Sequence, residues 1–189
     1  MKLGEGFVDS DVADEAEFDS KGAKLCAYFY EGSYDLVEGK DYTVTYKDNK
    51  SVTTDGRKAT ATFKFKGNYT GSITQKFDIR QMSIEDCNVV LKGGSSWKPS
   101  VKITSVSGAA LKEKTDYTVK YTYNKDVTVK CGKSYVKRNK GDEVNAKDVV
   151  PMGTEIKADF IGNGNYKEYA TYIFIYAGKN TEFRRVIES

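Results

Sequence analysis

The stretch Asp41-Tyr-Thr-Val-Thr-Tyr46 returns almost unchanged as Asp116-Tyr-Thr-Val-Lys-Tyr121. A Gly-Asn-Tyr sequence follows each copy downstream, at 67–69 and at 164–166. Two motifs that recur in the same order indicate that one supersecondary unit was duplicated along the chain. A duplicated fold without an obvious reactive centre is typical of a spacer or binding module, because chemistry resides in sites and not in folds.

The second copy is longer than the first. The two Asp positions lie 75 residues apart, whereas the two Gly positions lie 97 apart, so the second copy has 22 additional residues between its motifs. Within 126–152, apolar and polar residues alternate on both sides of a Gly-Lys pair, which is typical of a two-stranded hairpin. Because the first copy lacks this segment, we expect that deletion of 126–152 leaves both domains folded.

Apolar and polar residues alternate with a period of two through most of the chain. Segments 58–65 and 72–79 are rich in Thr, Phe and Ile and flank the first Gly-Asn-Tyr turn, which predicts a hairpin. The same pattern recurs at 155–161 and 169–176. Further strands are predicted near residues 25–30, 42–47, 88–91, 101–105 and 117–123. We therefore predict an all-β fold of two tandem immunoglobulin-like β-sandwich domains, the second with a β-hairpin-type insertion.

The repeat also predicts where the domains begin and end. We expect a first domain at 1–81, which includes an acidic N-terminal segment, and a second domain at 82–178 with its insertion at about 126–152. A polar C-terminal tail is expected at 179–189. Domains of about 80 to 95 residues have an adequate but thin core, so each is expected to fold alone.

The overall charge excludes one class of partner. The 30 basic and 27 acidic residues give a formal charge of +3, which is too small a field to favour nucleic acid. Acidic residues gather between Glu5 and Asp19, and lysines gather at 133–147; we interpret both runs as solvated faces. No segment approaches the roughly 18 apolar residues of a membrane helix, so no membrane insertion is predicted.

The residue types that are absent argue against catalysis. The chain contains no histidine, which removes Ser-His and Cys-His nucleophile pairs and imidazole ligands for zinc. A paired-carboxylate glycosidase would need a deep cleft, for which two small sandwiches offer little room. The acidic string at 9–14 lacks the Gly and closing Glu of a calcium-binding EF-hand loop and is interpreted as a linker. We predict no enzyme activity, no catalytic residue, no cofactor and no metal.

The cysteines offer two interpretations. Cys26, Cys87 and Cys131 are odd in number, lack the spacing of metal ligands and lie in alternating apolar contexts. Buried free thiols are the favoured interpretation, and one disulfide with a leftover thiol is the alternative.

Aromatic residues are the remaining candidates for ligand contact. The chain contains 14 tyrosines and one tryptophan, and we expect the strands at 28–30 and 117–123 to place aromatic rings on both faces, so that some of them are exposed. Exposed flat rings stack on sugars, whereas buried rings pack a sandwich core. We select Trp97, Tyr121, Tyr123 and Tyr135 as candidate ligand-binding residues, with core packing as the alternative role.

The ordered motifs resemble the bacterial immunoglobulin-like repeats of Gram-positive cell-surface and secreted proteins, especially those of gut Firmicutes. The resemblance covers most of residues 20–177. In the first copy it rests on the text of 36–49, 59–63, 67–71 and 77–79, and in the second on 97–100, 111–121, 153–157 and 162–166. The insertion and the three cysteines depart from the usual pattern.

This resemblance implies a role as a non-catalytic spacer, stalk or adhesive module of a larger exported protein. It implies an extracellular or cell-surface location, with a glycan or a host or bacterial surface protein as the possible partner. The alternative is a dedicated glycan- or protein-binding module that uses exposed aromatic residues or the insertion. Charged residues spread along the strands favour a monomer.

Overall fold

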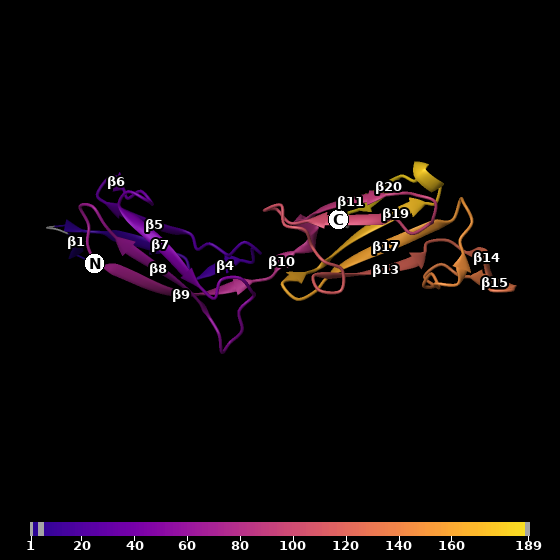
Figure 1. Ribbon diagram of the computed structural model, residues 1–189, viewed down its shortest axis with the longest axis horizontal. Coiled ribbons are helices and arrows are strands. Elements are labelled where there is room, and N and C mark those ends of the chain that lie inside the picture. The colour runs from indigo at the N-terminus through magenta and orange to yellow at the C-terminus, as the bar shows by residue number, and fades with distance from the viewer. Residues whose placement is uncertain (1, 4–5, 188–189) are drawn as a thin grey trace. The chain divides into compact units, whose positions relative to one another are not determined.

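The computed structural model describes residues 2–3 and 6–187 of the chain (Figure 1). The chain divides into two compact units, unit 1 at Met1–Met82 and unit 2 at Ser83–Ser189, and this division lies one residue from the predicted boundary. Strands make up 52% of the structure, and the described residues contain two short 3₁₀ turns, η1 (Ile84–Asp86) and η2 (Gly178–Asn180), and no α-helix. The all-β prediction is therefore confirmed.

Unit 1 contains two sheets and a small N-terminal hairpin. The hairpin pairs β1 (Lys2–Leu3) with β2 (Gly6–Phe7). The first sheet has the order β3-β5-β6, from β3 (Asp9–Val12), β5 (Ala27–Glu31) and β6 (Tyr34–Asp35). The second has the order β4-β9-β8-β7, from β4 (Glu15–Glu17), β9 (Ser72–Arg80), β8 (Ala59–Phe65) and β7 (Tyr42–Lys47). Most of the acidic string at 9–14, which was interpreted as a linker, thus forms the strand β3, and that interpretation was wrong.

Aromatic rings join the two sheets of unit 1 into one core. The Phe29 ring of β5 meets the rings of Tyr42, Phe63 and Phe65 edge-on, with centroids 5.0 to 5.1 Å apart. Phe29 and Phe63 are each 2% exposed. Burial of one such ring contributes roughly 1.5 to 3 kcal/mol, and edge-to-face contacts add to it. The alternation at 25–30, 42–47 and 58–65 therefore fixes which faces of the strands meet.

Unit 2 repeats the three central strands of unit 1 and adds others. Its largest sheet has the order β13-β17-β19-β20, from β13 (Tyr117–Tyr123), β17 (Glu155–Gly162), β19 (Tyr169–Ile175) and β20 (Phe183–Val186). The others are β11 (Asn88–Lys92) with β12 (Ser100–Thr104), and β15 (Ser134–Arg138), β14 (Val127–Cys131) and β16 (Asp148–Val149). Two short strands, β10 (Met82–Ser83) and β18 (Tyr166–Lys167), complete the list. Ile103, Phe160 and Phe174 are fully buried in its core.

The segment after residue 178 is not a polar tail, which corrects the sequence-based prediction. β20 pairs with β19 antiparallel, from Thr171 opposite Val186 to Phe174 opposite Phe183. The Phe183 ring lies on the Phe174 ring, with centroids 4.9 Å apart. The strand is only four residues long and contains two arginines, so its sequence shows no clear alternation. The segment forms a strand because it pairs with the edge of β19. A local sequence pattern does not reveal such a pairing.

The two repeated motifs are bonded to each other in each unit. In unit 1, Asp41 Oδ2 accepts the Val37 N–H over 2.8 Å, and the Asp41 carbonyl accepts the Lys66 N–H over 2.9 Å. Lys66 opens the Gly-Asn-Tyr turn. The equivalent bonds of Asp116 in unit 2 measure 2.7 and 2.9 Å. The backbone bond between the Asp of the first motif and the residue before the Gly-Asn-Tyr turn is therefore the same in both units.

Two positions of these loops have left-handed backbone. Gly67 and Gly164, in the turns, have φ of 68° and 62°, which glycine adopts without steric cost. In the loop before each Asp, Gly39 has φ of 89°, whereas Lys114 at the matching position of unit 2 has φ of 73°. Lys114 is thus strained where unit 1 is not.

Candidate functional site

The four candidate ligand-binding residues do not form one site. Trp97 and Tyr121 contact each other, Tyr123 lies in the core, and Tyr135 lies on the exposed hairpin of the insertion.

Trp97 covers Tyr121 edge-on. Their ring centroids are 5.1 Å apart at an interplanar angle of 86°, and Lys98 Nζ lies 5.9 Å from the centre of the Tyr121 ring. Trp97 is half-buried and Tyr121 is buried. Within the part of the chain that the structure describes, the Tyr121 hydroxyl has no hydrogen-bond partner. Burial raises the pKa of this hydroxyl, and Glu113 and Tyr117 raise it further. This geometry suits packing better than stacking on a ligand.

Tyr123 lies inside unit 2 and cannot present its ring to a ligand. It is 1% exposed, and its hydroxyl donates to Asp148 Oδ2 over 2.8 Å. The same carboxylate accepts bonds from Arg138 Nε and Nη2, over 3.1 and 2.8 Å, and from the Asn145 N–H over 3.2 Å. Burial raises the pKa of Asp148, but the bonds from Arg138, Tyr123 and Asn145 outweigh it and hold the pKa below its usual range. Tyr123 is therefore removed from the candidate ligand-binding residues.

This polar network ties the insertion to the rest of unit 2. Tyr123 belongs to β13, whereas Arg138, Asn145 and Asp148 belong to the insertion. Backbone bonds add to the attachment: the Tyr123 N–H donates to Asp142 over 2.9 Å, and the Val144 N–H donates to Tyr121 over 3.0 Å. Residues 141–144 thus cover part of the outer edge of β13. The insertion is an integral part of the unit, which argues against the expectation that it can be deleted without effect.

The hairpin predicted in the insertion is present and carries Tyr135. β14 and β15 pair antiparallel from Val127 opposite Arg138 to Cys131 opposite Ser134, and β16 adds a third strand (Figure 1). Tyr135 is 75% exposed. Of the four candidates, it is the one whose ring is open to solvent.

The sequence-based selection missed three exposed tyrosines of unit 1. Tyr28 and Tyr30 of β5 are 63% and 37% exposed on the outer face of the sheet β3-β5-β6, and Tyr34 of β6 is 41% exposed. The signal was present in β5, because the rings of Tyr28 and Tyr30 alternate with the buried Phe29. Conversely, Tyr121 and Tyr123 share the face of the buried Tyr117, and this shared parity marks them as inward-facing.

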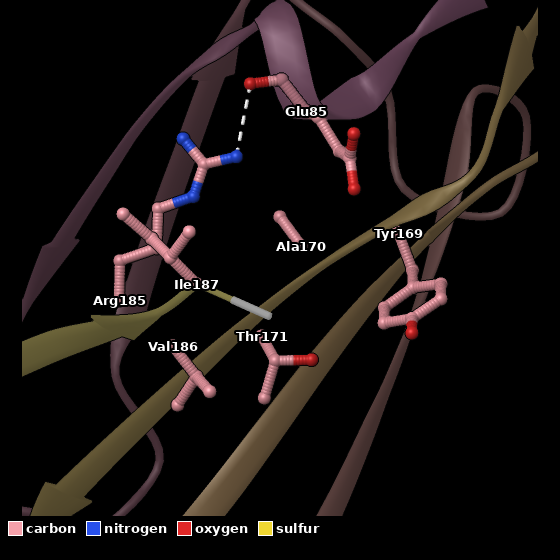
Figure 2. Close-up of a pocket in the computed structure, with 7 residues that line it drawn as sticks. All are labelled: Glu85, Tyr169, Ala170, Thr171, Arg185, Val186 and Ile187. Carbon is pink, nitrogen blue, oxygen red and sulfur yellow. Dashed lines mark hydrogen bonds between the residues drawn. The ribbon is translucent and has the colours of Figure 1, made fainter. Parts of the chain in front are cut away.

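Residues of β19, β20 and η1 line a hollow, which Figure 2 shows in close-up. Its volume is about 310 Å³. Arg185 Nη2 donates to the Glu85 carbonyl over 3.0 Å at one side, and the Tyr169 ring lies at the other. The Thr171 hydroxyl also lines the hollow but already donates to Asp159. A wider hollow of about 630 Å³ lies along Phe174 and Phe183. Neither hollow includes a candidate residue from the sequence analysis.

The described residues contain neither a metal-binding cluster nor a disulfide. Within the described ranges 2–3 and 6–187, no group of three or more Cys, Asp or Glu side chains could hold a metal ion. The three cysteines form no disulfide: Cys87 is buried, Cys131 is intermediate and Cys26 is exposed. The expectation of buried thiols was thus wrong for Cys26, which is exposed and directly precedes strand β5. None of the described helical segments could cross a membrane.

Comparison with known proteins found no matching protein-family model, curated protein or solved structure.

Proposed function

We propose that this chain is a non-catalytic spacer made of two immunoglobulin-like modules, which serves a bacterial surface or secreted protein. The main support for this proposal is that the same set of antiparallel strands occurs in both units. The strands β7, β8 and β9 of unit 1 and β13, β17 and β19 of unit 2 have the same antiparallel order, and the same two motifs close each unit. Repeated modules with separate cores lengthen a protein without adding a reactive centre.

Protected sheet edges support this role. Residues 141–144 cover part of β13, and the opposite edge strand of the same sheet, β20, has only four residues, two of them arginines. In unit 1, β4 pairs with the end of β9. Open edges invite pairing with other chains, so a spacer that is present in many copies benefits from covered ones.

The alternative is a dedicated glycan- or protein-binding module. The exposed ring of Tyr135, beside Lys130 on the neighbouring strand, is the observation in its favour. A sugar platform normally presents several rings flat to solvent, whereas Trp97 meets Tyr121 edge-on and Tyr123 is buried. Of the four candidate residues, Tyr135 is the one with its ring open to solvent, and Trp97 is half-buried. A single exposed ring is a poor sugar platform, which favours the spacer function.

A binding screen distinguishes the two functions. The full chain, a Tyr135→Ser variant and a Tyr169→Ser control are passed over bacterial, dietary and mucosal polysaccharides and host glycoproteins. Tyr169 is a suitable control because it is an exposed tyrosine of another sheet. The spacer predicts no specific binding by any of the three. A ligand that binds the full chain and the control but not Tyr135→Ser would replace the spacer with the binding module.

A further inference from the structure

Unit 1 presents an acidic surface with two exposed tyrosines. On the sheet β3-β5-β6, Asp9 and Asp35 lie directly opposite Tyr30, on the strands at either side. Asp11 lies opposite Tyr28 in the next row. Direct cross-strand partners project from the same face of a sheet, and all five side chains are exposed. We call these five residues the acidic face.

Unit 2 presents a basic surface on the hairpin of the insertion. Lys130 lies opposite Tyr135, and Thr128 lies opposite Lys137, so these four exposed side chains share one face. Lys133 adds a further charge in the turn. Residues 127–138 contain four basic and no acidic side chains. We call Thr128, Lys130, Lys133, Tyr135 and Lys137 the basic face.

The charges of both faces are unpaired within the described chain. The five ion pairs of the described residues use other side chains. Residues 9–35, which contain the acidic face, have eight acidic and two basic side chains. Unit 1 as a whole has 12 basic and 14 acidic residues, a net charge of −2, whereas unit 2 has 18 and 13, a net charge of +5. Unit 1 of one copy and unit 2 of another copy therefore have opposite net charges and attract each other.

The spacing of the two faces also corresponds. Both are β-sheet surfaces, on which side chains two positions apart are separated by about 6.8 Å and neighbouring strands by about 4.8 Å. Asp9 and Asp11 are spaced by the first distance, and Lys130 and Lys137 lie on a diagonal of about 8 Å. Long lysine stems can lie along the rings of Tyr28 while their ammonium groups reach the carboxylates.

We propose that the acidic face of one copy binds the basic face of a second copy of this chain. Because the two faces differ, the contact is heterologous and can extend into chains of copies. With five side chains on each face, the contact has far fewer residues than the roughly 20 to 30 a side of a stable interface, so the chain is a monomer when dilute and associates when concentrated at low salt. This contact goes beyond the spacer function, because it links neighbouring spacers to each other.

The test measures association of the full chain by sedimentation equilibrium at about 0.02 M and about 0.5 M NaCl, where screening differs severalfold. One variant, D9K/D11K, reverses the acidic face, and another, K130E/K137E, reverses the basic face. Matched controls are E38K/D55K in unit 1 and K102E/K112E in unit 2, whose side chains are exposed outside both faces. Circular dichroism confirms that each variant is folded.

We expect concentration-dependent association of the unmodified chain at low salt, which high salt abolishes. Each face variant should weaken self-association at least about tenfold, because three or so exposed charge pairs are lost or become repulsive. The controls should retain it. An equimolar mixture of D9K/D11K and K130E/K137E should associate again, because their reversed faces are complementary.

Four outcomes would overturn the proposal. The first is a chain that stays monomeric at low salt at every protein concentration, and the second is control variants that self-associate as weakly as the face variants. The third is a mixture of the two face variants that does not associate. The fourth is a salt effect that does not depend on protein concentration, which would place the contact within one chain. Binding of a synthetic oligolysine to the acidic face without self-association would assign that face to a foreign basic partner instead.

Discussion

Replacement of Asp148 by Ala should strongly destabilise unit 2 and leave unit 1 unaffected. The Asp148 side chain is 0% exposed and accepts bonds from Tyr123, Arg138 and Asn145. Loss of one partner of a buried charged pair costs about 3 to 5 kcal/mol. Arg138 retains 22% exposure and can turn toward water, so we expect a loss near the lower limit, about 3 kcal/mol.

Urea unfolding followed by tryptophan fluorescence measures this loss directly. Trp97 is the one tryptophan of the chain and lies in unit 2, so its signal does not report on unit 1. With a typical urea dependence for a small domain, the midpoint should fall by about 1.5 M or more. Tyr123→Phe removes one donor and should cost about 1 kcal/mol.

Glu143→Ala is the matched control, because Glu143 is an exposed acid of the same insertion. Its effect should stay within about 0.5 kcal/mol. If Asp148→Ala shifts the Trp97 transition no more than Glu143→Ala does, the network does not hold the insertion to the core.

Four further predictions concern unit 2 and use the same Trp97 signal. Tyr121→Phe should raise the free energy of unfolding by up to about 1 kcal/mol, because the buried hydroxyl lacks a partner among the described residues; a clear loss would reveal a partner. Lys114→Gly should raise it by about 0.5 to 1 kcal/mol, because the residue has φ of 73°, and no gain would show that the strain is absent. The folded-state pKa of Asp148 lies below its unfolded value near 4, so its stabilisation is complete above about pH 4 and is lost as the pH falls through the folded pKa; Asp148→Asn should flatten this acid dependence, and an unchanged profile would contradict the assignment. Deletion of 126–152 should lower the urea midpoint of the cooperative unfolding transition of unit 2 or abolish the transition. An unchanged transition would show that the insertion is dispensable.

The strands of the core hairpins could be predicted from sequence because their pattern is local. The prediction at 58–65 and 72–79 corresponds to β8 and β9, and that at 155–161 and 169–176 corresponds to β17 and β19. Alternation, turn residues and length all act within one segment there. β3 and β20 were missed because short, charged segments become strands only when a neighbouring edge accepts them.

The candidate residues were harder to predict because exposure depends on which face of a strand meets the core. Tyr123 and Tyr135 belong to similar alternating segments, yet the first is 1% exposed and the second 75%. The network around Asp148 joins residues that are 25 positions apart, and no local pattern indicates that pairing. Sequence reasoning therefore found the repeat and its insertion but not how the insertion is attached.

Each of the two units should fold as a β module on its own. This can be measured with ¹H–¹⁵N correlation spectra of the fragments 1–82 and 82–189 beside the full chain, with Met82 in both so that β10 stays whole in the second fragment. We expect well-dispersed spectra from both fragments, with core resonances that overlay those of the full chain. A collapsed spectrum from either fragment, or shifts throughout its core strands, would show that the units depend on each other for folding.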